Sequence, residues 1–275
     1  MVKKIKANFR QVGEIIALVI VAFGVYILDI SSLFKNYLME YELKPEIGNI
    51  ILYYLLNIGN IGFLIVLLGG LLKIFREFNK DFIMNSSNVY HDYPFFWYWF
   101  CARILGIKKC NLILVPIYMQ FKLVIEDIFN EYPLDEADFP VIKDEVDSAV
   151  EKINTGMDME LSEMNLILED TYVIELRQIP FSKKNLPTIK ISRNINNDHT
   201  RHFSLKFIQK ISEEIRKLPQ INRINIYATT NPMNTLRIIR TTFKMADRGN
   251  VDHIFVYQQE NKGIRVFCEK GYKIY

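Results

Sequence analysis

A polar loop between a predicted strand and a predicted helix is the part of this sequence best suited to binding a ligand. The segment ATTNPMNT, residues 228–235, follows an apolar run and leads into an amphipathic one. In open α/β sheets ligands bind in such loops, and free backbone N–H groups at a helix N-terminus attract anions. Two arginines follow one turn apart and could bind a phosphate or a carboxylate. The candidate ligand-binding residues are Thr229, Thr230, Asn231, Asn234, Thr235, Arg237 and Arg240.

The same residue types also have an ordinary structural role. Threonine and asparagine are common N-cap residues, and Pro232 suits the first turn of a helix. N-capping alone therefore stays open beside ligand binding. The chain has no glycine-rich phosphate loop and no G-x-G-x-x-G motif, so the common nucleotide fingerprints are absent.

A second polar segment, residues 193–203, offers Asp198, His199 and His202 just before a predicted helix. The two histidines could bind a metal only on one helical face and with a third ligand. A solvated loop with an aspartate N-cap is the favoured interpretation, and acid–base use of a histidine is the alternative. Neither a metal nor a cofactor is predicted.

Other signs of catalysis are weak. Asp170, Glu175 and Arg177 loosely resemble the carboxylates of metal-dependent nucleases, but the usual lysine is replaced. No G-x-S-x-G, H-E-x-x-H or kinase-like set occurs. The catalytic residues, if the chain has any, are unknown, and the balance favours a protein that is not an enzyme.

Two apolar runs predict membrane-spanning helices. Residues 15–28 carry no charge, and the run continues past Asp29 to Phe34; residues 50–72 contain no charge in 23 positions. A bilayer core about 30 Å thick needs about 20 such residues. We therefore predict spans at about 12–34 and 50–72. An uncleaved anchor is favoured over a signal peptide, because no A-x-A-like cleavage site follows the first run.

The flanking charges predict the topology. Positive residues favour the cytoplasmic side, and both outer flanks are rich in them. These are Lys3, Lys4, Lys6 and Arg10 before the first span, and Lys73, Arg76 and Lys80 after the second. We expect a multi-pass protein of the cell membrane with both termini in the cytoplasm and the lipid bilayer as its partner. Three cysteines without a CxxC pair suit a reducing compartment.

Small and polar residues in the second run predict helix packing. Asn57 and Asn60 lie three apart and share a face, and Gly59 and Gly62 permit close approach of backbones. This face either joins the first helix of the same chain or supports a homo-oligomer. Both alternatives remain open from the sequence alone.

The chain divides into three predicted parts: an anchor at 1–80, an aromatic connecting segment at 81–130, and a cytoplasmic α/β domain at 131–275. In the second part, the run YPFFWYWF at 93–100 is typical of a bilayer interface. Residues 94–107 are thus expected to form a helix along the cytoplasmic leaflet, with a buried core helix as the alternative.

The third part alternates between helical and strand-like patterns. Amphipathic helices are predicted at 141–153, 202–219 and 231–249, and strands at 165–170, 171–179, 188–193, 221–230, 251–259 and 263–275. Such spacing implies crossover connections. The predicted fold is a membrane-anchored α/β (or α+β) protein with a mixed sheet, packed helices and an antiparallel hairpin at the end.

Charge is strongly segregated in this part. Residues 131–170 carry a net charge of −11, and residues 171–275 carry +11. The basic half could face anionic lipid, an anionic ligand or nucleic acid. Its aromatic residues fall mostly on predicted core faces, so nucleic acid is not indicated.

At the level of architecture, the chain resembles the two-helix effectors of bacterial nucleotide-signalled antiphage systems. The resemblance rests on two short-looped helices joined to an α/β domain without a catalytic motif. It implies an oligomeric membrane effector or sensor that binds an anionic, nucleotide-like ligand and acts through its helices. The alternatives are a membrane-tethered enzyme acting on a phosphorylated or nucleic-acid substrate, and a structural subunit that anchors a complex.

Overall fold

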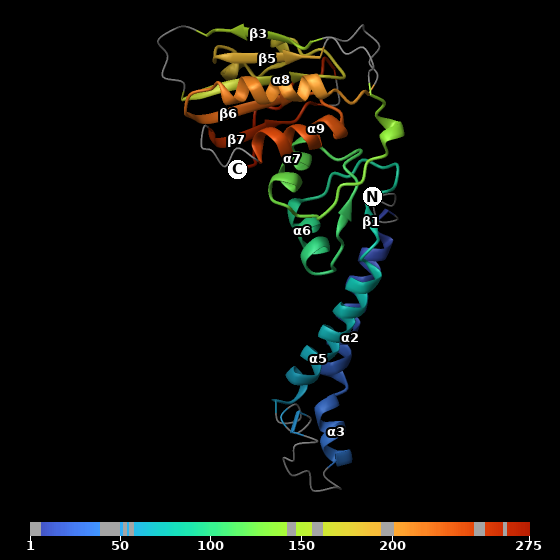
Figure 1. Ribbon diagram of the computed structural model, residues 1–275. Helices are drawn as coiled ribbons and strands as arrows, with labels where there is room; N and C mark the ends of the chain where they lie inside the picture. Colours follow the sequence, from blue (N-terminus) through green and yellow to red (C-terminus); the bar gives the residue numbers. More distant parts are fainter. Residues whose placement is uncertain are drawn as a thin grey trace. The chain divides into compact units, whose positions relative to one another are not determined.

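The computed structural model describes residues 7–38, 50–51, 54, 58–141, 147–155, 162–193, 201–244, 251–260 and 263–275 (Figure 1). Its contacts divide the chain into two compact units. The N-terminal unit contains Met1–Val89 and Phe96–Lys109, and the sheet unit contains Tyr90–Phe95 and Cys110–Tyr275. Each unit is described by itself below.

The N-terminal unit is built on the helices α2 (Phe9–Ile27), α3 (Ile30–Leu38) and α5 (Asn60–Phe78). Helices α2 and α5 lie side by side (Figure 1), and Val25 and Phe63 form the buried contact between them. Most other apolar side chains of both helices are exposed, as expected where lipid rather than protein covers them. Within the described residues, α2 is the helix long and apolar enough to cross a membrane.

The predicted spans differ from the observed helices in two ways. The first run is not one helix, because Asp29 adopts a left-handed backbone conformation with φ of 43° between α2 and α3. The second run begins among residues that lie partly outside the described ones, and α5 continues beyond residue 72 through Arg76 to Phe78.

Polar bonds join α2 to the end of α5. The guanidinium of Arg10 donates to the carbonyl oxygen of Phe78 at 2.7 Å, and Asn79 Nδ2 donates to Glu14 Oε2 at 2.9 Å. The same Asn79 amide also donates to the carbonyl oxygen of Leu105. The amide thus ties both α2 and the segment that follows α6 to the end of α5.

The aromatic segment forms helix α6 (Phe95–Arg103), and the short strands β1 (Ile83–Met84) and β2 (Lys109–Cys110) form a two-stranded sheet. Tyr98 and Cys101 are fully buried, whereas Phe96 is 67% exposed. The helix therefore has one face buried in the protein and one aromatic face that is exposed, and the expected contact of residues 94–107 with the bilayer surface stays a prediction. Burial raises the pKa of the Cys101 thiol to about 12.

The sheet unit contains one mixed six-stranded sheet in the order β3-β5-β4-β6-β7-β8. The strands are β3 (Ala149–Ile153), β4 (Glu163–Glu169), β5 (Thr188–Ser192), β6 (Ile221–Ala228), β7 (Val251–Tyr257) and β8 (Tyr272–Lys273). The four central strands are parallel, and both edge strands are antiparallel to their neighbours. The mixed α/β sheet predicted from the sequence is confirmed.

Helices cover one face of this sheet. Helix α8 (Leu205–Arg216) and helix α9 (Pro232–Ile238), which continues as a π-helical turn over Ile239–Phe243, lie on the same face (Figure 1). Helix α7 (Ile117–Ile125) packs against α9. Ile208, Ile211 and Ile215 of α8 are buried, as their helical spacing predicts, and Phe207 is buried with them, whereas Leu205 of the same predicted stripe is 52% exposed.

Loops cover part of the opposite face. Ile167, Tyr227 and Tyr257 project from the strands into a cluster with Ile174, Ile179 and Phe267. The loop side chains come from a segment that contains the 3-10 turns Leu176–Gln178 and Phe181–Lys183, and from the end of the chain. A third 3-10 turn spans Glu136–Asp138.

Three element predictions are wrong. The helix expected at 141–153 is replaced over 149–153 by strand β3, which pairs with β5, while 142–146 lie outside the described residues. Backbone pairing with an open sheet edge outweighs a helical pattern on a polar segment. The strand expected at 171–179 is a loop with a 3-10 turn, whose capping box joins Glu175 and Gln178. Of the strand expected at 263–275, only Tyr272–Lys273 forms a strand, β8, and the backbone of Ile274 and Tyr275 bonds to Ile254 of β7.

Candidate ligand-binding site

The carboxyl ends of the parallel strands bring a buried ion pair to one edge of the sheet. Asp170 follows β4 and Arg193 follows β5, so parallel pairing places them side by side. Arg193 Nε lies 2.7 Å from Asp170 Oδ1, and their side chains are 3% and 0% exposed. Such a pair is stable only where further hydrogen bonds satisfy the remaining polar atoms.

The loop after β6 supplies those bonds. Asp170 Oδ2 accepts from the backbone N of Asn231 at 3.0 Å, from Asn231 Nδ2 at 3.0 Å and from Asn234 Nδ2 at 2.9 Å. Both side-chain amides also donate to the carbonyl oxygen of His202. We call Asp170, Arg193, Asn231 and Asn234 the Asp170 network; it fixes the start of α9 against the ends of β4 and β5.

Two opposing effects act on the Asp170 carboxyl. Burial raises its pKa, while the charge of Arg193 and the bonds from Asn231 and Asn234 favour the ionised form. Since every partner in the network is a donor, the carboxylate is the form that this geometry accommodates.

The threonines of the loop are also bonded within the protein. Thr229 Oγ1 donates to the carbonyl oxygen of Tyr172 at 2.8 Å, and Thr171 Oγ1 donates to that of Thr229 at 2.6 Å. The hydroxyls of Thr230 and Thr235 lie 2.7 Å apart. The loop is therefore held from both sides by buried hydrogen bonds.

The structure brings the predicted ligand-binding residues together but assigns their short polar side chains to internal bonds. Asn231 is the N-cap of α9, with its side chain accepting from the N–H of Asn234 at 2.9 Å. The capping alternative thus applies to Asn231, whereas Thr229, Thr230, Asn234 and Thr235 form other hydrogen bonds within the protein. The arginines differ: Arg237 is exposed, and the guanidinium of Arg240 lies 5.9 Å from the centre of the Tyr132 ring.

The other catalytic candidates that the structure describes do not converge. Asp198 and His199 lie outside the described residues, and His202 contributes its carbonyl oxygen to the Asp170 network. Glu175 is exposed and pairs with Arg177, while Asp170 is buried with Arg193. Over the described part of the chain, no group of histidine, cysteine, aspartate and glutamate side chains is placed to hold a metal ion.

The sheet unit also contains a hollow that the sequence did not predict. It has a volume of about 360 Å³ and lies where β7 ends, lined by Tyr90, Asp92, Pro116, Tyr118, Gln258, Gln259, Glu260, Cys268 and Tyr272. The rings of Tyr118 and Tyr272 stack at 3.7 Å, and Tyr118 Oη donates to Asp92 at 3.4 Å. Burial and the charge of Asp92 raise the pKa of Tyr118, so its hydroxyl stays neutral. These residues are scattered along the chain, and no spacing signals them.

The predicted transmembrane packing residues contact the first helix of the same chain where they are described. Asn60 Nδ2 donates to Asp29 Oδ1 at 2.8 Å, and Asn60 Oδ1 accepts from the backbone N of Ser31 at 2.9 Å. Gly59, the N-cap of α5, has a positive φ of 74°, a conformation that glycine adopts without strain, and Gly62 is buried. Asn57 lies outside the described residues.

Apolar N-terminal helices in the same chain as a mixed α/β sheet define a class of membrane-anchored α/β protein. Comparison with known families places the chain within that class. Residues 1–275 match the model of the SMODS- and ubiquitin system-associated 2TM effector domain, and the chain belongs to this family. It is therefore a membrane effector in antiphage defence, in agreement with the architectural resemblance.

Comparison with solved structures gives distant matches to a nucleotide-bound receptor. The Acinetobacter baumannii Cap4 SAVED/CARF-domain containing receptor with the cyclic trinucleotide 3'3'3'-cAAA matches at a TM-score of 0.37 and 8% identity, covering 60% of this chain and 37% of that one. The same receptor with 2'3'3'-cAAA matches at 0.36 and 7%, over 60% and 36%. The chain thus spans little more than a third of those receptors. No curated protein matches it.

Proposed function

We propose that the chain is a membrane effector whose sheet unit binds an anionic nucleotide ligand at the carboxyl edge of its parallel strands. The observation that carries the proposal is the Asp170 network, which fixes the loop at residues 229–235 and leaves Arg237 exposed beyond it. A rigid loop followed by cations is a good anion site, because little side-chain freedom is lost on binding. Membership in an effector family associated with SMODS supports a nucleotide as the ligand.

In this proposal, ligand binding to the sheet unit acts on the membrane-spanning helices. Two spanning helices, with both termini in the cytoplasm, are supported by the family's two-transmembrane description and by the lysines and arginines that flank the apolar runs. Ligand binding to a homo-oligomer would change the packing of these helices. Asn57 and Asn60 remain the proposed packing residues, since amides are common contacts between helices in lipid.

Direct binding tests the ligand site. The detergent-purified full-length chain is titrated with a panel of cyclic di- and trinucleotides, with calorimetry as the readout. Loss of a charge-assisted hydrogen bond of about 1.5–3 kcal/mol should weaken binding of the responsive probe about 10- to 100-fold in Arg237→Ala. Arg216→Ala removes an equally exposed arginine at the end of α8 and should leave binding unchanged.

The outcomes separate the hypotheses. Equal binding by wild type and Arg237→Ala contradicts the proposed site. Conversion of a probe to product would indicate the membrane-tethered enzyme instead. Absence of binding across the panel, together with co-purification of a complex, would favour the structural anchor.

A further inference from the structure

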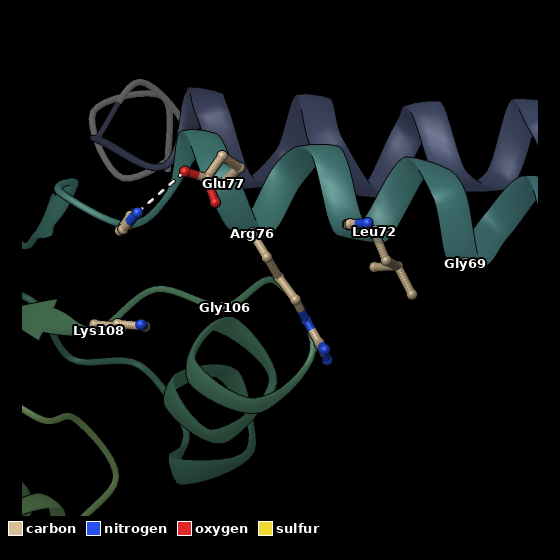
Figure 2. Close-up of a pocket in the computed structure, with 8 residues that line it drawn as sticks. Gly69, Leu72, Arg76, Glu77, Gly106 and Lys108 are labelled. Atoms are coloured by element: carbon tan, nitrogen blue, oxygen red, sulfur yellow. Dashed lines mark hydrogen bonds and ion pairs between the residues drawn. The ribbon is translucent and has the colours of Figure 1, made fainter.

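A cavity of about 550 Å³ lies in the N-terminal unit, beside the C-terminal half of α5 (Figure 2). Its lining from that helix is Gly69, Leu72, Lys73, Arg76 and Glu77, and Lys80 lines it just beyond the end of α5. Leu72 and Lys73 lie three and four residues after Gly69, and Arg76 and Glu77 lie three and four residues after Lys73, so these positions form one stripe along α5. Gly106 and Lys108, from the segment that follows α6, line the facing wall. We call this hollow the α5 cavity.

One arginine builds the facing wall. Arg76 extends from α5 towards the end of α6 (Figure 2), where Nε donates to the carbonyl oxygen of Ile104 at 3.1 Å and Nη2 donates to that of Arg103 at 3.0 Å. These carbonyls end a helix and lack partners within it, so the guanidinium satisfies them. The wall of the α5 cavity is therefore held at a defined position.

A glycine makes this approach possible. Gly106 has φ of +76°, and a Cβ at this position would lie 2.4 Å from Arg76 Cγ. Any other residue would displace the arginine and strain the backbone. The close contact between Gly106 and Arg76 is thus a required part of the cavity.

Of the basic side chains that line the α5 cavity, some are bonded within the protein and others are not. Arg76 is used by the α6 carbonyls, and Lys80 Nζ pairs with Glu77 at 3.1 Å (Figure 2). Lys73 and Lys108 are exposed, and neither has a hydrogen bond or ion pair with any residue that the structure describes. The cavity therefore carries two cations available to an anion that enters it.

Its lining also changes character along the helix. Gly69 and Leu72 are apolar and lie within the predicted second span, which ends at residue 72, and Lys73 begins the charged portion. An acyl chain fits the first part and a phosphate fits the second, because lysines near the membrane surface attract anionic headgroups. A free phosphate could share the lysines, but it gains nothing from the apolar end.

We propose that the α5 cavity binds the headgroup of an anionic phospholipid, with its phosphate between Lys73 and Lys108 and its first acyl carbons against Leu72. The site uses none of the residues assigned to the nucleotide ligand. It would fix the depth of α5 in the bilayer and the position of the chain segment that follows α6.

Native mass spectrometry of the detergent-purified full-length chain tests the proposal. The protein is titrated with dioleoyl phosphatidylglycerol, with dioleoyl phosphatidylcholine and with inorganic phosphate. We expect tight binding of phosphatidylglycerol alone, and about a 25-fold loss in Lys73→Gln/Lys108→Gln, at about fivefold per lysine near an anionic surface. Lys270→Gln/Lys273→Gln removes two exposed lysines elsewhere and should bind as the wild type does.

Each other result overturns the proposal. Equal affinity for the two lipids would show that the site does not distinguish the charge of the headgroup. Phosphate binding as tight as that of phosphatidylglycerol would show that the site binds a free anion. An unchanged affinity in the Lys73/Lys108 variant places the lipid elsewhere. Both lysines are exposed, so their replacement leaves the fold intact.

The geometry of the wall gives a second test. Gly106→Ala displaces Arg76 and should lower phosphatidylglycerol affinity about tenfold while both lysines remain. Gly70→Ala is the matched control, because a Cβ there meets nothing within 4 Å. Equal lipid binding by the two variants would show that the wall does not shape the site. Circular dichroism checks that both variants keep their helical content.

Discussion

The Asp170 network and the α5 cavity use cations in opposite ways. In the network, Arg193 is buried and lies 2.7 Å from Asp170. In the cavity, Lys73 and Lys108 are exposed and unpaired among the residues that the structure describes. In a buried pair the cation already interacts with a partner within the folded protein, whereas an exposed cation can still interact with a ligand. The contrast shows that a functional arginine or lysine must be judged by its partners, not by its charge alone.

Removing the network carboxylate should have the largest effect. Asp170→Ala leaves the Arg193 guanidinium buried without its counter-ion, which costs about 3–5 kcal/mol of the free energy of unfolding. Chemical unfolding of the full-length chain measures the loss. Asp138→Ala, at an exposed site of the same unit, should cost less than about 0.5 kcal/mol.

A double variant sharpens this expectation. Asp170→Leu/Arg193→Met replaces both charges with apolar groups and should recover part of the stability lost in the single variant. A single Asp170→Ala variant within about 1 kcal/mol of wild type would contradict the organising role of the network.

Arg76 should matter for local structure in the N-terminal unit. Arg76→Ala removes both hydrogen bonds to the end of α6 and should cost about 2 kcal/mol of local stability. Hydrogen exchange of the amides at 104–107 should speed up accordingly. Lys73→Ala in the same cavity should leave exchange unchanged. Equal effects of the two variants would contradict the distinction between Arg76, which is bonded within the protein, and Lys73, which is available to a ligand.

Asn60 tests packing in the anchor. Asn60→Leu loses its bonds to Asp29 and Ser31 and should weaken helix association by about 1 kcal/mol. Unfolding of the chain in mixed micelles with increasing SDS measures this loss. Ile61→Leu, at an exposed apolar position beside it, is the control. A change in oligomeric state without loss of intrachain stability would instead assign Asn60 to contacts between chains.

The smallest effect is expected from a partly exposed ion pair on the sheet. Burial raises the pKa of Glu163, but hydrogen bonds from Lys183 and Asn225 and the charges of Lys183 and Arg223 hold it below its usual value. A lowered native pKa contributes stability at neutral pH that is lost as the pH falls below about 4.3. Glu163→Gln should remove that part of the acid sensitivity, measured as melting temperature against pH. An unchanged pH profile would show that Glu163 contributes nothing.

Strong local patterns made much of the fold predictable. The apolar runs of β4 and β6, which are buried almost throughout, and the helical spacing of the apolar residues in α8 were identified correctly from the sequence. Strand β3 was not, since its polar residues carry no alternation and only pairing with β5 makes it a strand. Residues 171–179 are rich in β-formers but cover the sheet as a loop.

The sites were harder to predict than the elements. The polar loop after β6 was found from its composition and its place before a helix, but the partnership of Asp170 with Arg193 depends on the pairing of β4 with β5. The α5 cavity depends on the conformation of Gly106, which no local motif announces. The Tyr118–Tyr272 stack joins residues far apart in the sequence, and only the folded chain reveals it.

The bonds between α2 and α5 have a mechanical consequence. Arg10 and Glu14 hold one end of the pair, through Phe78 and Asn79, and Asp29 and Ser31 hold the other end through Asn60. Because α2 and α5 are hydrogen-bonded near both ends, neither helix can slide along the other without breaking several of these bonds at once. A force applied to one helix therefore acts on both, and we expect the two helices to tilt or rotate together.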